Sequence, residues 1–267
     1  MKRKIGILAA MISLAVCTPA YAYTDTLGER EVAAELYNGF MENRGNYSKD
    51  GYDASIGMHL HNYLSLDYFP CENIILEYRW DTDTKSQTIG VVTENAEEVI
   101  AKVEAYNKAV NDIVSSIPEY ITTDREKAIY LNNKVVNICE YDHYYDKLES
   151  GNGYQALVEG KSICGGYAQA YYNLCTAAGI KCRMIYGFAG DTCDERGVRL
   201  PDHAYNSVLI NGEWLYVDTT WNDSCEKNEY LLVDSKTFSK THEDVLFYEN
   251  ELAEDKITVV DVSENTI

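Results

Sequence analysis

Residues 203–220, HAYNSVLINGEWLYVDTT, contain two strand-like runs that flank the dipeptide Asn211-Gly212. Two alternating runs around Asn-Gly are the strongest short-range signal of a β-hairpin with a two-residue type I′ turn. Such a turn fixes the register, because Ile210 must pair with Glu213 and every step outward adds one further pair.

The predicted register places His203 and Asp218 on one face of the hairpin as diagonal neighbours. The opposite face is mostly apolar and suited to a core, with Ala204, Asn206, Val208, Ile210, Leu215 and Val217. A carboxylate beside an imidazole can accept its Nδ1–H and leave Nε2 aimed at a nucleophile. The pair is therefore typical of a base and its orienting residue, although a surface histidine and a turn-starting aspartate are the ordinary alternatives.

A second stretch, KSICGGYAQAY at residues 161–171, precedes a run of helical composition. The composition predicts a helix over residues 168–178 that ends at Gly179, a residue that favours the position after a helix. Ser162 is a candidate N-cap for this helix.

Cys164 would then lie in the first turn of that helix. Unpaired backbone N–H groups and the helix dipole favour a thiolate there, and the same groups could hold an oxyanion. Gly165 and Gly166 would leave room for a substrate carbonyl. The alternative is that Cys164 is one more buried or disulfide-bonded cysteine.

Three blocks of the sequence resemble the bacterial transglutaminase-like domain, a branch of the papain-like superfamily. They are YQALVEGKSICGGYAQAYYNLCTAAGIKCRMIYG, HAYNSVLINGEWLYVDTTWND and YLLVDSKTFSKTH, within a region from about Tyr141 to His242. The resemblance implies an α+β core in which a helix bearing the nucleophile packs on an antiparallel sheet. It implies that Cys164, His203 and Asp218 form the catalytic triad.

The sequence leaves open which side chain would complete the oxyanion hole. Tyr154 is the candidate, with Gln155 beside it, against the alternative that Tyr154 only packs at a loop end. His242 belongs to the third block and is expected to be structural.

The first 22 residues predict a secretory signal peptide. Residues 2–4 are basic, residues 5–16 form an apolar run too short to span a bilayer, and residues 20–22 have a small-x-small cleavage pattern. A retained anchor and a lipid on Cys17 are the alternatives. The expected location is therefore secreted or cell-surface, without a stable membrane span after cleavage.

Two regions are expected after residue 22, an N-terminal accessory region (23–120) and a catalytic core (121–267). The periodicity predicts several elements in them: a helix over 28–42, mostly loop or short strands over 43–70, strands at 73–80 and 87–93, a helix over 95–116, and a capping box at Thr123 that opens another helix.

The 267-residue chain has a formal charge of −20, with 43 acidic and 23 basic side chains. A polyanion would be repelled by this charge, so nucleic acid is excluded as an expected partner.

Seven of the eight cysteines remain after signal cleavage, and an odd number leaves at least one free thiol. Cys193 with Cys225 is the favoured disulfide pair. No C-x-x-C pair occurs, so no structural zinc is expected. His59 and His61 could share one face of a strand, but the sequence suggests no third metal ligand. Neither a metal nor a cofactor is expected.

The sequence therefore predicts an exported cysteine-nucleophile enzyme that acts on amide or peptide bonds by acyl transfer. Hydrolysis, as in a protease or amidase, is favoured over transglutamination because no feature marks an amine site. The expected partner is a peptide or protein substrate, for example a cell-wall peptide or surface protein. The alternative is a catalytically inactive secreted binding or assembly module on the same fold.

Overall fold

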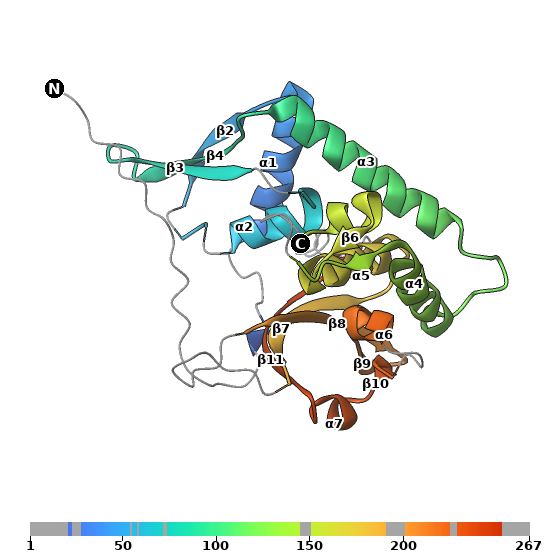
Figure 1. The fold of residues 1–267 in the computed structure, drawn as a ribbon. Coiled ribbons are helices and arrows are strands. Elements are labelled where there is room, and N and C mark those ends of the chain that lie inside the picture. Colours follow the sequence, from blue (N-terminus) through green and yellow to red (C-terminus); the bar gives the residue numbers. More distant parts are fainter. Residues whose placement is uncertain are drawn as a thin grey trace, which may run out of the picture.

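The computed structural model describes residues 21–22, 28–53, 55–57, 59–71, 74–144, 151–190, 201–224 and 229–252. These ranges form an α+β structure, as predicted (Figure 1). The helices are α1 (Glu29–Asn43), α2 (Leu60–Tyr63), the π-helical η1 (Leu64–Tyr68), α3 (Ala96–Ser115), α4 (Asp124–Ile138), the π-helical η2 (Gln155–Glu159), α5 (Cys164–Ala177), α6 (Thr219–Ser224) and α7 (Ser235–Phe238). In this described part of the chain, no helix is both long and apolar enough to cross a membrane.

The strands belong to three sheets. They are β1 (Tyr21–Ala22), β2 (Tyr47–Tyr52), β3 (Ile75–Asp81), β4 (Ser86–Val92), β5 (Glu140–Tyr141), β6 (Lys161–Ser162), β7 (Cys182–Ala189), β8 (His203–Ile210), β9 (Glu213–Val217), β10 (Leu231–Val233) and β11 (His242–Glu249). The largest sheet has the order β1-β11-β7-β8-β9-β10, and its neighbours are antiparallel except for β1 beside β11. Strand β1 lies within the segment that the sequence predicts to be a signal peptide. Cleavage of that segment stays a prediction.

The predicted hairpin is confirmed as β8 and β9. Ile210 pairs with Glu213, and the ladder continues to the pair Asn206–Val217. Asn211 and Gly212 have φ angles of 53° and 83°, and a type I′ turn requires positive φ at both positions.

Helix α5 lies between the six-stranded sheet and the helices α3 and α4 (Figure 1). The inner face of the hairpin supports it, as the apolar pattern predicts. The side-chain amide of Asn206 donates to the carbonyl oxygens of Ala168 in α5 and Arg183 in β7, both at 3.1 Å. One buried amide thus ties the helix to two strands.

The predicted C-terminal end of α5 is confirmed, but its predicted N-cap is not. Gly179 follows the helix with a φ of 76°, the left-handed conformation expected there. The predicted N-cap is wrong, because Ile163 precedes the helix and no side chain caps it. Ser162 instead pairs with Tyr141 in the short β5–β6 ladder, which places it outside the helix.

Most elements of the N-terminal region agree with the periodicity, and Thr123 and Glu126 form the predicted capping box of α4. The prediction for residues 43–70 is wrong in part, because residues 60–68 are helical. Leu60, Tyr63 and Leu64 are almost fully buried there, so tertiary packing outweighs a weak local signal. Most buried hydrophobic side chains from α1 to β11 form one continuous core, and Ile185, Tyr205 and Phe238 form a second, smaller cluster.

Candidate active site

Cys164 is the first residue of α5, so its side chain lies at the helix N-terminus, as predicted. It is partly exposed, whereas the other four described cysteines, Cys71, Cys139, Cys175 and Cys182, are buried. The favoured pair Cys193–Cys225 lies outside the described residues. Cys164 is therefore the described thiol best placed to meet a substrate.

The two glycines after Cys164 lie against the backbone of residues 151–152. A Cβ on Gly166 would lie 2.5 Å from the carbonyl oxygen of Asn152, and one on Gly165 would lie 2.7 Å from that of Gly151. The glycines thus permit close packing of a loop on the helix start, rather than only the approach of a substrate.

Gly166→Ala is expected to destabilise the protein and to displace Cys164. The reason is that the added Cβ would clash with the Ser162 side chain and with the Asn152 carbonyl oxygen, and the latter belongs to backbone and cannot rotate away. The expected loss in the free energy of unfolding is about 1–3 kcal/mol, measured by urea denaturation. Gly45→Ala is the matched control, since its Cβ would find its nearest neighbour at 3.9 Å. Equal stability of the two variants would contradict this packing.

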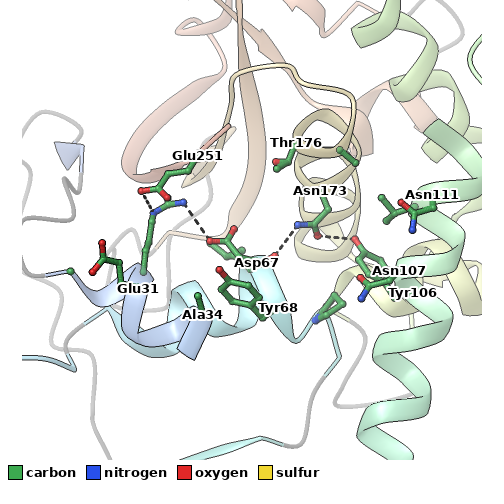
Figure 2. Close-up of a pocket in the computed structure, with 16 residues that line it drawn as sticks. Glu31, Ala34, Asp67, Tyr68, Tyr106, Asn107, Asn111, Asn173, Thr176 and Glu251 are labelled. Carbon is green, nitrogen blue, oxygen red and sulfur yellow. Dashed lines mark hydrogen bonds and ion pairs between the residues drawn. The ribbon is translucent and has the colours of Figure 1, made fainter. Parts of the chain in front are cut away.

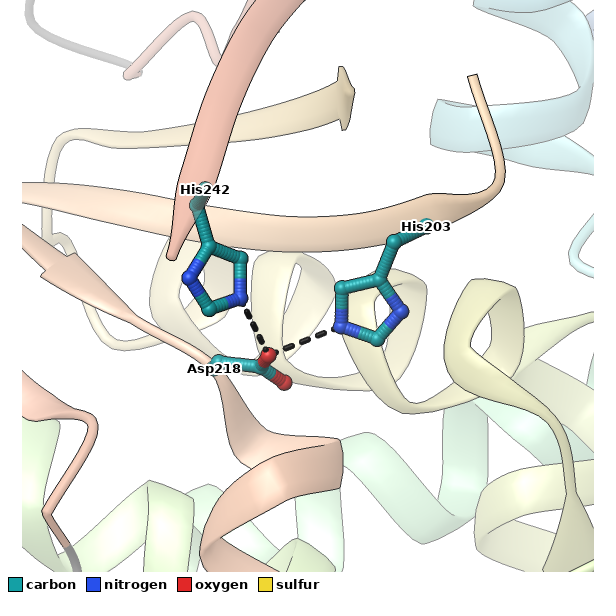
Figure 3. A group of neighbouring side chains, drawn as sticks. All are labelled: His203, Asp218 and His242. Atoms are coloured by element: carbon teal, nitrogen blue, oxygen red, sulfur yellow. Dashed lines mark hydrogen bonds and ion pairs between the residues drawn. The ribbon is translucent and has the colours of Figure 1, made fainter. Parts of the chain in front are cut away.

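His203 and Asp218 meet as the hairpin register predicts (Figure 3). His203 is the first residue of β8, and Asp218 follows the last residue of β9. The Nε2 atom of His203 lies 2.7 Å from Oδ2 of Asp218. The carboxylate is fully buried, and its Oδ1 accepts the backbone N–H of Trp221 at 3.0 Å.

The predicted roles of the two imidazole nitrogens are wrong. Asp218 contacts Nε2 of His203, and not Nδ1. Nε2 lies at the end of the His203 ring that is farther from the backbone, and this end reaches the Asp218 carboxylate. Cys164 is a close enough neighbour of His203 to raise the pKa of the imidazole, and Nδ1 is the ring nitrogen that Asp218 leaves to face the thiol.

A second histidine binds the same carboxylate. The Nε2 atom of His242, the first residue of β11, lies 3.1 Å from Oδ2 of Asp218. Figure 3 shows both rings directed at one oxygen. The motif SKTH marks His242 in the sequence, but this contact could not be predicted from it. Pairing of β11 with β7 brings His242 to the site.

The electrostatics of the site favour charge separation. Burial alone would lower the pKa of His203, but hydrogen bonds to Asp218 and Cys164 outweigh it and raise the pKa to about 10. Burial alone would raise the pKa of Asp218, but hydrogen bonds from His203 and His242 hold it below its usual value. An imidazolium between Cys164 and a carboxylate is therefore the favoured state.

Tyr154 is directed toward α3, where Lys102 Nζ lies 5.9 Å from the centre of its ring. Its backbone N–H donates to the carbonyl oxygen of Pro70 at 2.9 Å. Its role in an oxyanion hole stays a prediction. Gln155 is buried, and in the described part of the chain its Oε1 has no hydrogen-bond partner.

The donor set of His203, Asp218 and His242, two imidazoles and a carboxylate, is of a kind that zinc binds, and the three ligand atoms lie within 4.8 Å of one another. Both Nε2 atoms already bond Oδ2, so a metal would have to displace both hydrogen bonds. The predicted pair His59 and His61 lies at the start of α2, not on a strand. His59 contacts the Tyr248 hydroxyl at 3.0 Å, so the proposed strand geometry is wrong.

A cavity of about 790 Å³ lies at the other end of α5, against α1 and α3 (Figure 2). Its wall includes Asn173 and Thr176, at least nine residues along the helix from Cys164. Several lining groups bind one another, since the Tyr106 hydroxyl donates to Oδ1 of Asn173 at 2.8 Å and Arg30 pairs with Asp67 at 3.4 Å. This cavity is separate from the Cys164 site.

A cysteine at the start of a core helix, beside a histidine–aspartate pair on an antiparallel sheet, is the arrangement of a papain-like fold. Residues 111–219 match the family model described as the transglutaminase-like superfamily, a range that holds Cys164, His203 and Asp218. Over these residues the chain matches a transglutaminase-like domain.

Known proteins resemble the chain over part of their length. It is 23% identical to human kyphoscoliosis peptidase over 189 residues, which cover 67% of this chain and 28% of that protein. It is 28% identical to Drosophila melanogaster hillarin over 131 residues, covering 46% of this chain and 16% of that protein. The chain thus spans less than a third of the relatives that it matches.

Among solved structures, a candidate cysteine protease from Cytophaga hutchinsonii aligns with a TM-score of 0.37 and 16% identity, over 68% of each chain. A TGase aligns with a TM-score of 0.35 and 12% identity, over 66% of this chain and 51% of the other. These scores are too low to carry an argument about this chain.

Proposed function

We propose that the protein is a cysteine-nucleophile enzyme that cleaves or transfers acyl groups from amide or peptide bonds. The observation that carries this proposal is the position of His203, whose Nε2 lies 2.7 Å from Asp218 and whose pKa is raised by Asp218 and by the neighbouring Cys164. Nucleophile, base and orienting residue in contact are the arrangement that covalent acyl transfer needs.

In this mechanism the Cys164 thiolate attacks the carbonyl carbon, and His203 holds the thiol proton on Nδ1. His203 then protonates the leaving amine as the tetrahedral intermediate collapses to a thioester. Asp218 remains ionised and orients the ring through Nε2. Because the N–H of Gly166 already bonds the carbonyl of Ile163 at 3.0 Å, the candidate oxyanion donors are the N–H groups of Cys164 and Gly165.

Release of the acyl group by water would make the enzyme a protease or amidase, and release by an amine would make it a transglutaminase. We favour hydrolysis, since the sequence marks no amine site and the human relative is named a peptidase. A peptide or protein at the cell surface is the proposed substrate, which follows from the predicted signal peptide.

Incubation with a library of glutamine-containing peptides, with and without a primary amine, tests this function. Peptide cleavage or ammonia release that is lost in Cys164→Ala would support hydrolysis, and amine incorporation would support cross-linking. If none of these products forms and Cys164 shows no selective reactivity, the inactive binding or assembly module would replace the enzyme proposal.

The raised pKa of His203 predicts the pH dependence of catalysis. The imidazolium keeps its proton until the pH rises through about 10, and the leaving amine needs that proton. We therefore expect kcat/KM to stay level through neutral pH and to fall near pH 10. A fall centred near pH 6.5, the value of an unperturbed histidine, would contradict the ion pair.

A further inference from the structure

Asp218 accepts three hydrogen bonds, although orienting His203 needs only one. Oδ2 receives Nε2 of His203 at 2.7 Å and Nε2 of His242 at 3.1 Å, and Oδ1 receives the backbone N–H of Trp221 at 3.0 Å. The carboxylate is completely buried. A buried anion needs such donors to remain ionised, so His242 supplies a part of what stabilises it.

His242 is itself held in one orientation. Its ring stacks on Phe238 with centroids 4.0 Å apart and an interplanar angle of 20°, and the Trp221 ring lies 4.5 Å away. Its Nδ1 lies 2.8 Å from the hydroxyl of Thr241. The ionised carboxylate of Asp218 can only accept, so Nε2 of His242 carries a proton that points at Asp218. The Thr241 hydroxyl also lies 3.3 Å from the carbonyl oxygen of Phe238, to which it can donate.

We propose that His242 is a positioning residue, whose Nε2–H holds the Asp218 carboxylate ionised and in place so that His203 forms an ion pair with Cys164. This proposal deepens the proposed function and rests on it. Without this donor, the pKa of the buried Asp218 carboxyl group would rise, and the carboxylate would be protonated more readily. It would then stabilise the His203 imidazolium less, and the pair with Cys164 would form only at higher pH.

Other ionisable groups surround the three residues. They are Cys164 of α5, which raises the pKa of His203; Tyr205 of β8 and Tyr230 before β10, whose rings lie 5.1 and 5.7 Å from that of His242; Tyr216 of β9 and Asp244 of β11, which contact Tyr205; and Asp202 and Asp223, which lie close to His203 and Asp218 in the chain. The hydroxyls of Tyr205 and Tyr216 donate to Asp244 at 2.7 and 2.6 Å, and the Tyr167 hydroxyl donates to Asp223 at 2.8 Å. Burial, followed by the neighbouring carboxylate, raises the pKa of Tyr205 and of Tyr216, so both stay neutral between pH 4 and about 9.

The test is the pH profile of Cys164 alkylation by iodoacetamide, measured by site-resolved mass spectrometry in the full-length protein. His242→Leu removes the donor, and His242→Gln keeps an amide N–H that can reach Asp218. We expect the acid limb to move up by about one pH unit in His242→Leu. We expect His242→Gln to stay close to wild type, which a purely structural role would not produce.

Thr241→Val serves if His242→Leu does not fold, because Thr241 is exposed and valine has the same shape. It removes the hydroxyl that contacts Nδ1 and helps to orient the ring, so a smaller upward shift is expected. A wild-type profile in folded His242→Leu, or in Thr241→Val if that variant must be used, would overturn the role of His242. Failure of the enzyme proposal is distinguishable, because wild-type Cys164 would then show no selective alkylation.

Discussion

Replacing Cys164 by alanine is expected to lower kcat/KM by roughly 10⁴-fold or more, because Cys164 is the proposed nucleophile that forms the acyl-enzyme. The melting temperature should change little, since the side chain is partly exposed at the helix start. Rates are compared on the best peptide of the library, and thermal unfolding is followed by circular dichroism.

Cys139→Ala is the matched control for this loss. Burial raises the pKa of the Cys139 thiol to about 12, so it carries no thiolate at neutral pH. Folded Cys139→Ala should keep its kcat/KM within a few-fold. Residual activity above about a tenth of wild type in Cys164→Ala would contradict the assignment of the nucleophile.

Asp218→Asn has the second largest expected effect. The amide offers one acceptor oxygen in place of two and carries no charge, so it cannot stabilise the His203 imidazolium or satisfy three donors. We expect kcat to fall by about 10³- to 10⁴-fold, measured in single-turnover kinetics. The free energy of unfolding should fall by about 1–3 kcal/mol, because at least one buried donor is left unpaired.

Asp223→Asn is the matched control for Asp218→Asn. It removes a neighbouring carboxylate that does not contact His203. Asp223 lies in α6 and accepts the hydroxyl of Tyr167 at 2.8 Å. Its amide variant should keep most of the activity. If Asp218→Asn and Asp223→Asn lose equal activity, the carboxylate of Asp218 has no special role.

Local rules explain what could be predicted from the sequence. The turn at Asn211-Gly212 fixes the register of β8 and β9, and that register alone brings His203 to Asp218. The capping box at Thr123 predicts the start of α4 for the same reason, since each signal acts within a few residues.

Long-range packing explains what could not be predicted. His242 reaches Asp218 only because β11 pairs with β7, more than fifty residues earlier in the chain. The close approach of residues 151–152 to Gly166, and the imidazole nitrogen that meets Asp218, depend on the same tertiary packing. Helices α2 and η1 form where burial outweighs local preference.

The most direct test of the account is competitive labelling of the native protein with iodoacetamide near pH 7, resolved cysteine by cysteine. We predict that Cys164 reacts at least about tenfold faster than the buried thiols Cys71, Cys139, Cys175 and Cys182. His203→Ala should remove this advantage. Equal reactivity of Cys164 in the wild-type and His203→Ala proteins would contradict the ion pair on which the proposed chemistry depends.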